Sequence, residues 1–298
     1  MKFKWQVDSP SRMHLRTFLS SKRISRSLLK SIKFNGGHIL VNDSPKRTNE
    51  MVEKGDMVQI DLPPEPSNPH VVLSDNPIDI RYEDEDYLIV NKPPYLPTVQ
   101  SARNQVDTLV NRVKNYYVKQ NYESQVIHVV TRLDQDTSGL VLLAKHRFAH
   151  SVIDQEMKQH RINKQYIALV QGKFDSSHGK IKFDIARDPN SFIKRRVVPS
   201  GEGKPSLTEY WVLDYRDGVS KVRVKLHTGR THQIRVHMSA IGHPLIGDAL
   251  YGDASPAINR QALHCYLLDF QNVFRDKLVK VETKLPEDMS NYLERRRG

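Results

Sequence analysis

The sequence is poor in the residues that mark several large classes of protein. Cys265 is the one cysteine among 298 residues, so the chain can form no internal disulfide and offers no cysteine-based metal site. The 13 histidines show no metal-ligand spacing such as His-Glu-x-x-His. No apolar run approaches the ~20 residues of a membrane span, and the first residues lack the apolar core of a secretory signal. We therefore expect a cytoplasmic protein that holds no metal and contacts no membrane.

Acidic residues are also scarce relative to basic ones. The chain has 34 Asp and Glu against 46 Lys and Arg, which gives a formal net charge of +12. In a folded protein such a surplus favours a polyanionic partner, most often nucleic acid. A lysine excess that serves only solubility is the alternative.

The basic surplus is concentrated near the N-terminus. Residues 1–48 hold eleven Lys or Arg and two acids. Apolar residues at helical spacing predict two short helices there, and Ser25 is suited to cap the second. We expect a small module over residues 1–62, a semi-rigid linker rich in proline over residues 63–76, and a larger domain over residues 77–298.

Two stretches of the larger domain combine charged residues with turn formers next to a predicted strand. Residues 131–139 precede an unbroken apolar run that predicts a strand buried on both faces. Asp134 is therefore expected on a loop at the edge of a packed core, near Arg132, where chemistry is usually placed. Residues 227–237 predict a strand end at Gly229 and then a short helix. Taken alone, a solvated Arg–Asp pair and structural salt bridges are the alternatives.

Taken together, these strings resemble the motifs of the large-subunit (RluA-type) RNA pseudouridine synthases. Residues 132–139, Arg-Leu-Asp-Gln-Asp-Thr-Ser-Gly, resemble the catalytic signature, although the family usually has His where this chain has Thr131. Asn-Lys-Pro at residues 91–93 and Lys-Gln-Tyr at residues 164–166 are similar to the first and second motifs. Gly-Arg-Thr-His-Gln-Ile-Arg at residues 229–235 is similar to the third.

The resemblance implies a fold and a set of site residues. The fold would be α+β, with a mixed, mostly antiparallel central sheet flanked by helices and a cleft for RNA. Asp134 would be the catalytic carboxylate, Arg235 its cationic partner and Tyr166 the aromatic that stacks on the target base. Arg132 would enter the space that the base vacates. The expected substrate-binding residues are Arg132, Arg230, His232 and Leu263.

The basic N-terminal module resembles the S-four-type RNA-binding domain. Its phosphate-contacting face would hold Arg23, Arg26, Lys30 and Lys33. Such contacts give salt-dependent affinity and do not read sequence. A solvated helix face is the alternative. The polar, basic residues 173–206 are expected to form a mobile loop or a hairpin against RNA.

The implied reaction breaks an N-glycosidic bond, turns the base and rejoins it through carbon, so we expect no cofactor. It needs an ionised carboxylate, which a neighbouring cation favours; attack on the sugar and proton abstraction from it both stay open. We expect a monomer that isomerises specific uridines in structured RNA. The expected substrate is 23S ribosomal RNA, and tRNA is the alternative. A non-catalytic RNA-binding or ribosome-assembly protein and an RNA-directed glycosidic hydrolase are the competing hypotheses.

Overall fold

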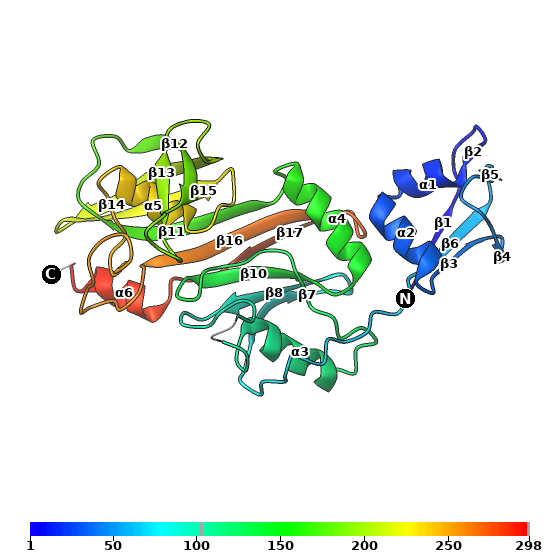
Figure 1. Ribbon diagram of the computed structural model, residues 1–298, viewed down its shortest axis with the longest axis horizontal. Coiled ribbons are helices and arrows are strands. Elements are labelled where there is room, and N and C mark those ends of the chain that lie inside the picture. Colours follow the sequence, from blue (N-terminus) through cyan, green and yellow to red (C-terminus); the bar gives the residue numbers. More distant parts are fainter. Residues whose placement is uncertain (102–103, 297–298) are drawn as a thin grey trace.

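The computed structural model describes residues 1–101 and 104–296. The chain forms a small N-terminal body and a larger body built on one long sheet (Figure 1). A core of buried apolar side chains lies in each.

The N-terminal body is a four-stranded antiparallel sheet with two helices. The strand order is β1 (Lys2–Gln6), β6 (Met57–Asp61), β3 (His38–Val41) and β4 (Ser44–Pro45). The short strands β2 (Met13–His14) and β5 (Met51–Val52) pair separately. The helices are α1 (Leu15–Ser21) and α2 (Arg26–Phe34). As the sequence predicts, Ser25 caps α2, because its hydroxyl accepts a hydrogen bond from the Leu28 amide at 3.2 Å.

The larger body is organised around an 11-stranded sheet, of which nine strands form a continuous path. Their order is β13 (Arg195–Val198), β12 (His178–Arg187), β14 (Lys204–Arg216), β15 (Val219–Leu226), β11 (Asn163–Gln171), β16 (Leu263–Asn272), β10 (Ser138–Ala144), β8 (Tyr87–Lys92) and β7 (Asp79–Glu83). Beside this path, β17 (Lys277–Glu282) pairs with β16 and β9 (His128–Val129) with β10. The β10–β16 pair is parallel and the other described pairs are antiparallel. The predicted α+β fold with a mixed, mostly antiparallel sheet is confirmed.

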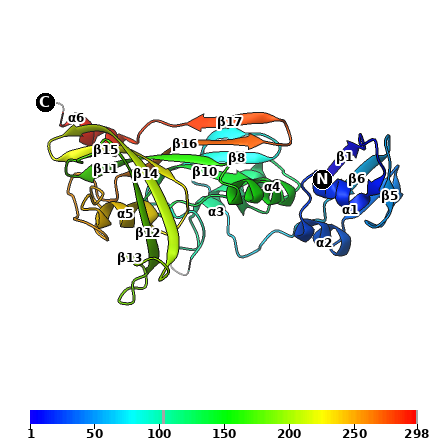
Figure 2. The same cartoon turned by 90° about the horizontal axis from the view of Figure 1, so that it is seen from above.

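Four helices accompany this sheet. They are α3 (Leu109–Lys119), α4 (Arg147–Lys158), α5 (Gln233–Ala240) and α6 (Glu287–Glu294). In Figure 2, α3, α4 and α5 lie on the same side of the sheet, and the β12–β13 hairpin projects on that side as well. Every residue of β10 is buried, as expected for a strand covered on both faces.

Residues 63–78 contain no helix or strand, yet they are attached to α3 along much of their length. The Lys114 ammonium donates to the carbonyls of Asn68 and Val71, each at 2.7 Å. The Asn111 amide donates to the Val72 carbonyl, also at 2.7 Å. Prolines stiffen this segment, and these bonds fix its path over the larger body.

The two bodies are packed against each other through α4. Phe148 and Val152 of α4 join the buried core of the N-terminal body, and the Phe148 ring lies 5.0 Å from that of Phe3. Polar contacts flank this apolar patch: Arg23 forms an ion pair with Glu156, and the Arg147 guanidinium donates to the Ser31 hydroxyl at 2.8 Å. The N-terminal body therefore docks on α4, with Phe274 of the turn between β16 and β17 packed beside it.

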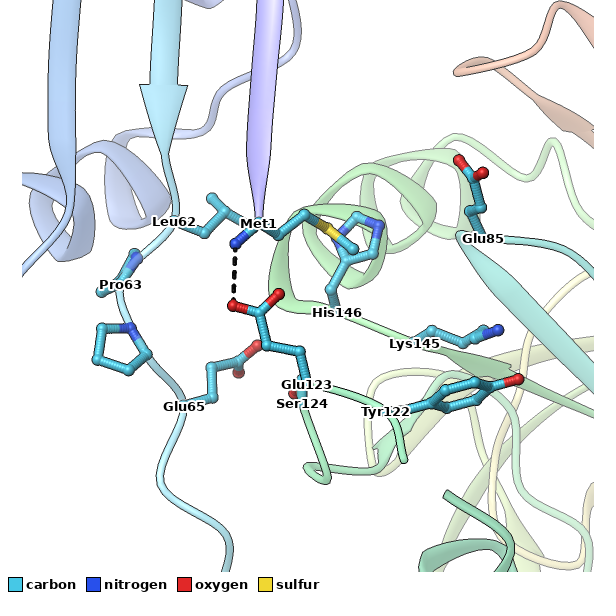
Figure 3. Close-up of a pocket in the computed structure, with 11 residues that line it drawn as sticks. Met1, Leu62, Pro63, Glu65, Glu85, Tyr122, Glu123, Ser124, Lys145 and His146 are labelled. Atoms are coloured by element: carbon cyan, nitrogen blue, oxygen red, sulfur yellow. Dashed lines mark ion pairs between the residues drawn. The ribbon is translucent and has the colours of Figure 1, made fainter. Parts of the chain in front are cut away.

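A cavity of about 430 Å³ lies beside this junction (Figure 3). Its lining includes Glu65, Glu85 and Glu123, and the N-terminal ammonium of Met1 lies 3.5 Å from Glu123. Lys145, which also lines it, is paired with Glu83 at 2.8 Å. With three carboxylates against these two cations, the cavity offers no surplus of positive charge for an RNA backbone.

Candidate active site

The strand β10 brings the Asp134 loop against the neighbouring strand β16. Gly139 adopts φ +116°, and a Cβ atom there would lie 2.3 Å from the Cys265 carbonyl oxygen. Only glycine allows this backbone conformation together with so close an approach. The parallel register Ser138↔His264 and Gly139↔Cys265 thereby fixes where the loop ends.

The loop itself is anchored from several directions. The buried Lys92 ammonium donates to the carbonyls of Gln135, Leu96 and Pro93 at 2.9, 2.7 and 3.0 Å. Arg260, held by a bidentate pair with Asp288 of α6, donates to the Asp136 carbonyl at 3.1 Å. These bonds fix the loop backbone directly after Asp134. The carboxylate is thus presented from a rigid support.

Thr131 has a structural position at the start of the motif. It is buried, and its hydroxyl accepts a hydrogen bond from the Leu142 amide at 2.9 Å. Its own amide donates to the Leu142 carbonyl at 3.1 Å. The residue that departs from the family pattern therefore fastens the motif to β10.

The third motif forms the entry to α5. His232 precedes the helix in a left-handed conformation with φ 58° and ψ 18°, a conformation that costs a non-glycine residue on the order of 1 kcal/mol. At the other end, Gly242 donates to the Ser239 carbonyl and His243 to that of Met238, which is a Schellman closure. The helix is therefore short and its first turn points Arg235 inward.

Arg235 lies between two carboxylates and is bound chiefly to the one that the sequence did not predict. Its guanidinium makes a bidentate pair with Asp248 at 2.7 Å for both bonds, and the Asp248 side chain is fully buried. Its contact with Asp134 is longer, 3.6 Å from Nη1 to Oδ2. Burial opposes the charge on Arg235, but the pair with Asp248 outweighs burial and raises the pKa of Arg235.

His232 approaches the same Asp134 oxygen. Its Nε2 lies 4.0 Å from Oδ2, while its Nδ1 lies 2.9 Å from the Tyr251 hydroxyl. The Arg195 amide of β13 donates to that hydroxyl at 2.8 Å. Burial lowers the pKa of His232 and Asp134 partly offsets this. A largely neutral imidazole therefore stands beside the carboxylate, held by Tyr251.

A cavity of about 570 Å³ opens over these groups and contains the predicted site residues of the larger body. Its lining includes Asp134, Arg235, Tyr166, Arg132, Arg230, His232 and Leu263. The sequence therefore located seven residues that the fold brings to one place from four separate segments. Tyr166 is 5% exposed, and burial raises its pKa well above the ordinary range, so the phenol stays neutral.

The charges of this cavity are unbalanced in favour of cations. Among the described residues that line it, Arg132, Lys164, Arg230 and Arg235 are cationic and Asp134 is the one carboxylate. Arg132 is exposed, and no ion pair involves it within the described part of the chain. The cavity is thus suited to an anionic ligand.

The basic residues predicted on the N-terminal module divide into two groups. Arg26, Lys30 and Lys33 are exposed on α2 at spacings of four and three residues, so they share one helix face. Arg23 lies apart from them: its guanidinium is paired with Glu156 in the junction between the bodies. None of the four lines the cavity over Asp134.

Three groups that support the site were not predicted as site residues. Asp248 orients Arg235, Tyr251 orients His232, and Lys92 holds the Asp134 loop. Asp248 and Tyr251 belong to a stretch that resembles the family, but nothing in their spacing indicates these partners. Lys92 gives a weak signal, because a lysine within an apolar strand must find acceptors.

Two further features concern what the described residues lack. No helix within residues 1–101 and 104–296 is long and apolar enough to cross a membrane. Over the same residues, no three His, Cys, Asp or Glu side chains gather in a way that would hold a metal ion.

Comparison with known proteins identifies the family. The model for "RNA pseudouridylate synthase" matches residues 86–240, which include the Asp134 loop and α5. The chain belongs to the RNA pseudouridylate synthase family. The predicted family and the predicted enzyme class, an isomerase, are therefore confirmed. The match spans the loop, Tyr166 and Arg235, although it names no role for any of them.

Relatives resemble the synthase over nearly its full length. The "Uncharacterized RNA pseudouridine synthase YjbO" of Bacillus subtilis is 37% identical, with 94% of this chain and 98% of that protein aligned. The "Ribosomal large subunit pseudouridine synthase D" of Zymomonas mobilis is 34% identical, with 96% and 92% aligned.

Solved structures agree with the fold. The structure named "Human RNA Pseudouridylate Synthase Domain Containing 1" has a TM-score of 0.59 and 28% identity, and the match covers 78% of this chain and 98% of that one. "Human RNA Pseudouridylate Synthase Domain Containing 4" has a TM-score of 0.61 at 20% identity, which supports the fold alone.

Proposed function

We propose that the synthase isomerises specific uridines of large-subunit ribosomal RNA and that Asp134 is the carboxylate that acts on the target nucleotide. The observation that carries the proposal is the position of Asp134: an anchored carboxylate beside Arg235, in a cavity whose other charged lining residues are Lys or Arg. The relative from Zymomonas mobilis, which is named a ribosomal large subunit synthase, favours this RNA over tRNA.

Arg235 provides a cation beside Asp134 without engaging both of its oxygens. The Arg235 guanidinium lies 3.6 Å from one Asp134 oxygen, a longer contact than its two bonds to Asp248. Because Asp248 takes the two short bonds of Arg235, the Asp134 oxygens are not locked in a bidentate pair. Asp134 is thereby left free to reach the sugar, either at carbon 1 or at a neighbouring C–H.

The proposed reaction balances within the nucleotide. The bond from N1 to the sugar carbon breaks, a bond from C5 of the uracil to that carbon forms, the proton on C5 leaves, and N1 gains a proton. No electron is gained or lost. Groups of the chain therefore need only to position the base and the sugar and to exchange protons.

The base must leave its stack to reach Asp134, at a cost of a few kcal/mol. In the proposal, Tyr166 packs on the extruded uracil and Arg132, exposed two residues before Asp134, occupies the gap in the RNA. Arg230, His232 and Leu263 contact the same nucleotide from the other walls of the cavity. Tyr166→Phe keeps the ring and should retain binding, whereas Tyr166→Ala should not.

We also propose that the N-terminal module, of S-four type, holds RNA by the exposed face of Arg26, Lys30 and Lys33. Arg23 contributes to this module by fixing its orientation through Glu156. Such phosphate contacts position the RNA without reading its sequence. We expect the synthase to act as a cytoplasmic monomer, which light scattering of the purified protein and cell fractionation test.

Pseudouridine mapping tests the substrate. Ribosomal RNA and tRNA from cells with and without the gene are compared by carbodiimide labelling and primer extension. We expect one or more large-subunit positions to lose the modification and to regain it when the purified synthase acts on the unmodified RNA. Loss confined to tRNA, or no loss in either RNA, would overturn the ribosomal assignment.

A further inference from the structure

The cavity over Asp134 contains a cation that the proposed reaction leaves without a role. Lys164 lies on β11, two residues before Tyr166, and both side chains line the cavity. Within residues 1–101 and 104–296, Lys164 takes part in none of the ion pairs or side-chain hydrogen bonds. An ammonium group in a partly buried position normally has a partner, because burial of an unpaired charge is costly.

We propose that Lys164 binds a backbone phosphate of the RNA strand that enters the cavity, at or next to the target nucleotide. The inference rests on the proposed entry of RNA into this cavity and adds one specific contact to it. Lys164 and Tyr166 are separated by about 7 Å along the strand, which is the scale of one nucleotide. A base stacked on Tyr166 therefore places its own or an adjacent phosphate within reach of Lys164.

The surroundings of Lys164 favour an anion over a neutral ligand. Asp134 is the one carboxylate among the described lining residues, and it already faces Arg235 and His232. Burial lowers the pKa of Lys164, with Cys265 as the one opposing neighbour. A phosphate supplied by RNA removes this penalty, since it gives the ammonium the counter-charge that the protein withholds.

Salt dependence of binding tests the contact directly. The probe is a fluorescent oligouridylate, and every variant carries Asp134→Asn so that binding is measured without turnover. Removing one phosphate contact makes the slope of log affinity against log salt shallower by about 0.7 for a single strand, which is about a fivefold loss near 0.1 M salt. We expect this change for Lys164→Gln, and recovery in Lys164→Arg, which keeps the charge.

A matched control separates this contact from the general effect of charge. Lys280 on β17 is about half exposed and paired with Glu282, outside the cavity, so Lys280→Gln removes the same charge elsewhere. We expect Lys280→Gln to leave the slope unchanged. Thermal unfolding shows whether either glutamine variant has lost its fold. If Lys164→Gln is unfolded, Lys164→Arg is compared with the parent instead.

The outcomes distinguish a wrong contact from a wrong site. If Arg132→Gln reduces the slope and Lys164→Gln does not, RNA enters the cavity but Lys164 touches no phosphate, and the inference is overturned. The same holds if Lys164→Gln weakens binding at an unchanged slope, since its ligand is then uncharged. If neither variant changes the slope, RNA does not enter the cavity, and the proposed function fails together with the inference.

Discussion

Replacing Asp248 by Asn should damage the synthase in two separable ways, because this carboxylate is what keeps Arg235 away from Asp134. The side chains of Arg235 and Asp248 are 9% and 0% exposed, so water does not screen their pair. Breaking a buried pair by removing one charge costs about 3–5 kcal/mol. Asn keeps one oxygen that can accept from the guanidinium, so we expect the lower end, about 3 kcal/mol of the free energy of unfolding.

The catalytic effect follows from geometry. With one Asp248 oxygen lost, the Arg235 guanidinium can move from its 3.6 Å contact to a direct pair with Asp134. A displacement on this scale costs about 100-fold in rate, since the reacting groups are no longer aligned. We therefore expect Asp248→Asn to lower kcat about 100-fold while RNA affinity changes little.

The assay is tritium release from carbon 5 of uracil under saturating RNA, combined with urea unfolding. Asp107→Asn is the control: Asp107, just before α3, makes a bidentate pair with Arg112 of that helix at 2.8 Å for both bonds, outside the cavity. It should cost stability and leave kcat unchanged. If Asp248→Asn retains the kcat of the parent, or if its kcat falls no further than that of Asp107→Asn, Asp248 does not orient Arg235 for catalysis.

Three further predictions concern the scaffold. Phe148→Ala removes a buried ring from the junction and should lower the free energy of unfolding by about 3–5 kcal/mol, with faster proteolysis within residues 63–76. An unchanged cleavage rate would show that other contacts join the two bodies. Gly139→Ala places a Cβ 2.3 Å from the Cys265 carbonyl oxygen and keeps a φ that strains alanine, which should lower the free energy of unfolding by on the order of 3 kcal/mol. Soluble protein of full stability would contradict the β10–β16 register. Burial lowers the pKa of His264 from 6.5 to about 4, so the unfolded chain takes up the proton before the folded one as the pH falls. The contribution of His264 to the free energy of unfolding is therefore full above pH 6.5 and falls by up to about 3 kcal/mol towards pH 4. Urea titrations of His264→Asn over this range should show a smaller fall than those of the parent.

The residues predicted for the site belong to a few contiguous strings, and the structure brings those of the larger body to one cavity. The Asp134 string leads into a strand and the Arg235 string follows one, and the apolar runs beside them identify these strands. Their meeting in one cavity followed from the family resemblance alone, since periodicity says nothing about which strands are neighbours. The parallel β10–β16 contact, which sets the loop, has no signature except the glycine at residue 139.

The partners of the predicted residues were beyond sequence reasoning for a physical reason. Asp248 lies 13 residues after Arg235, and their pair depends on the turn that follows α5. Likewise, a basic helix face gives no indication of which of its cations meets another part of the protein. Arg23 was grouped with Arg26 and Lys30, yet it is paired with Glu156, whose burial only the packed structure reveals.

Residues 173–206 illustrate the limit on a weakly patterned segment. Their polar composition left a loop and a hairpin open, and the structure contains the hairpin β12–β13 joined to β14. Buried positions in β12 do not alternate regularly, because the hairpin projects from the body and is exposed over much of both faces (Figure 2). A strand of this kind lacks the period of two that identifies strands in a sequence.

The proposed catalytic role of Asp134 depends on the charge of its side chain. Asp134→Asn keeps the size of the side chain and its place in the anchored loop, and removes the anion. Tritium release from carbon 5 of uracil in the modified RNA, measured beside filter binding of the same RNA, tests this directly. We predict that the variant binds RNA about as tightly as the parent and releases no tritium above background. Measurable turnover by Asp134→Asn would contradict the assignment of the catalytic carboxylate.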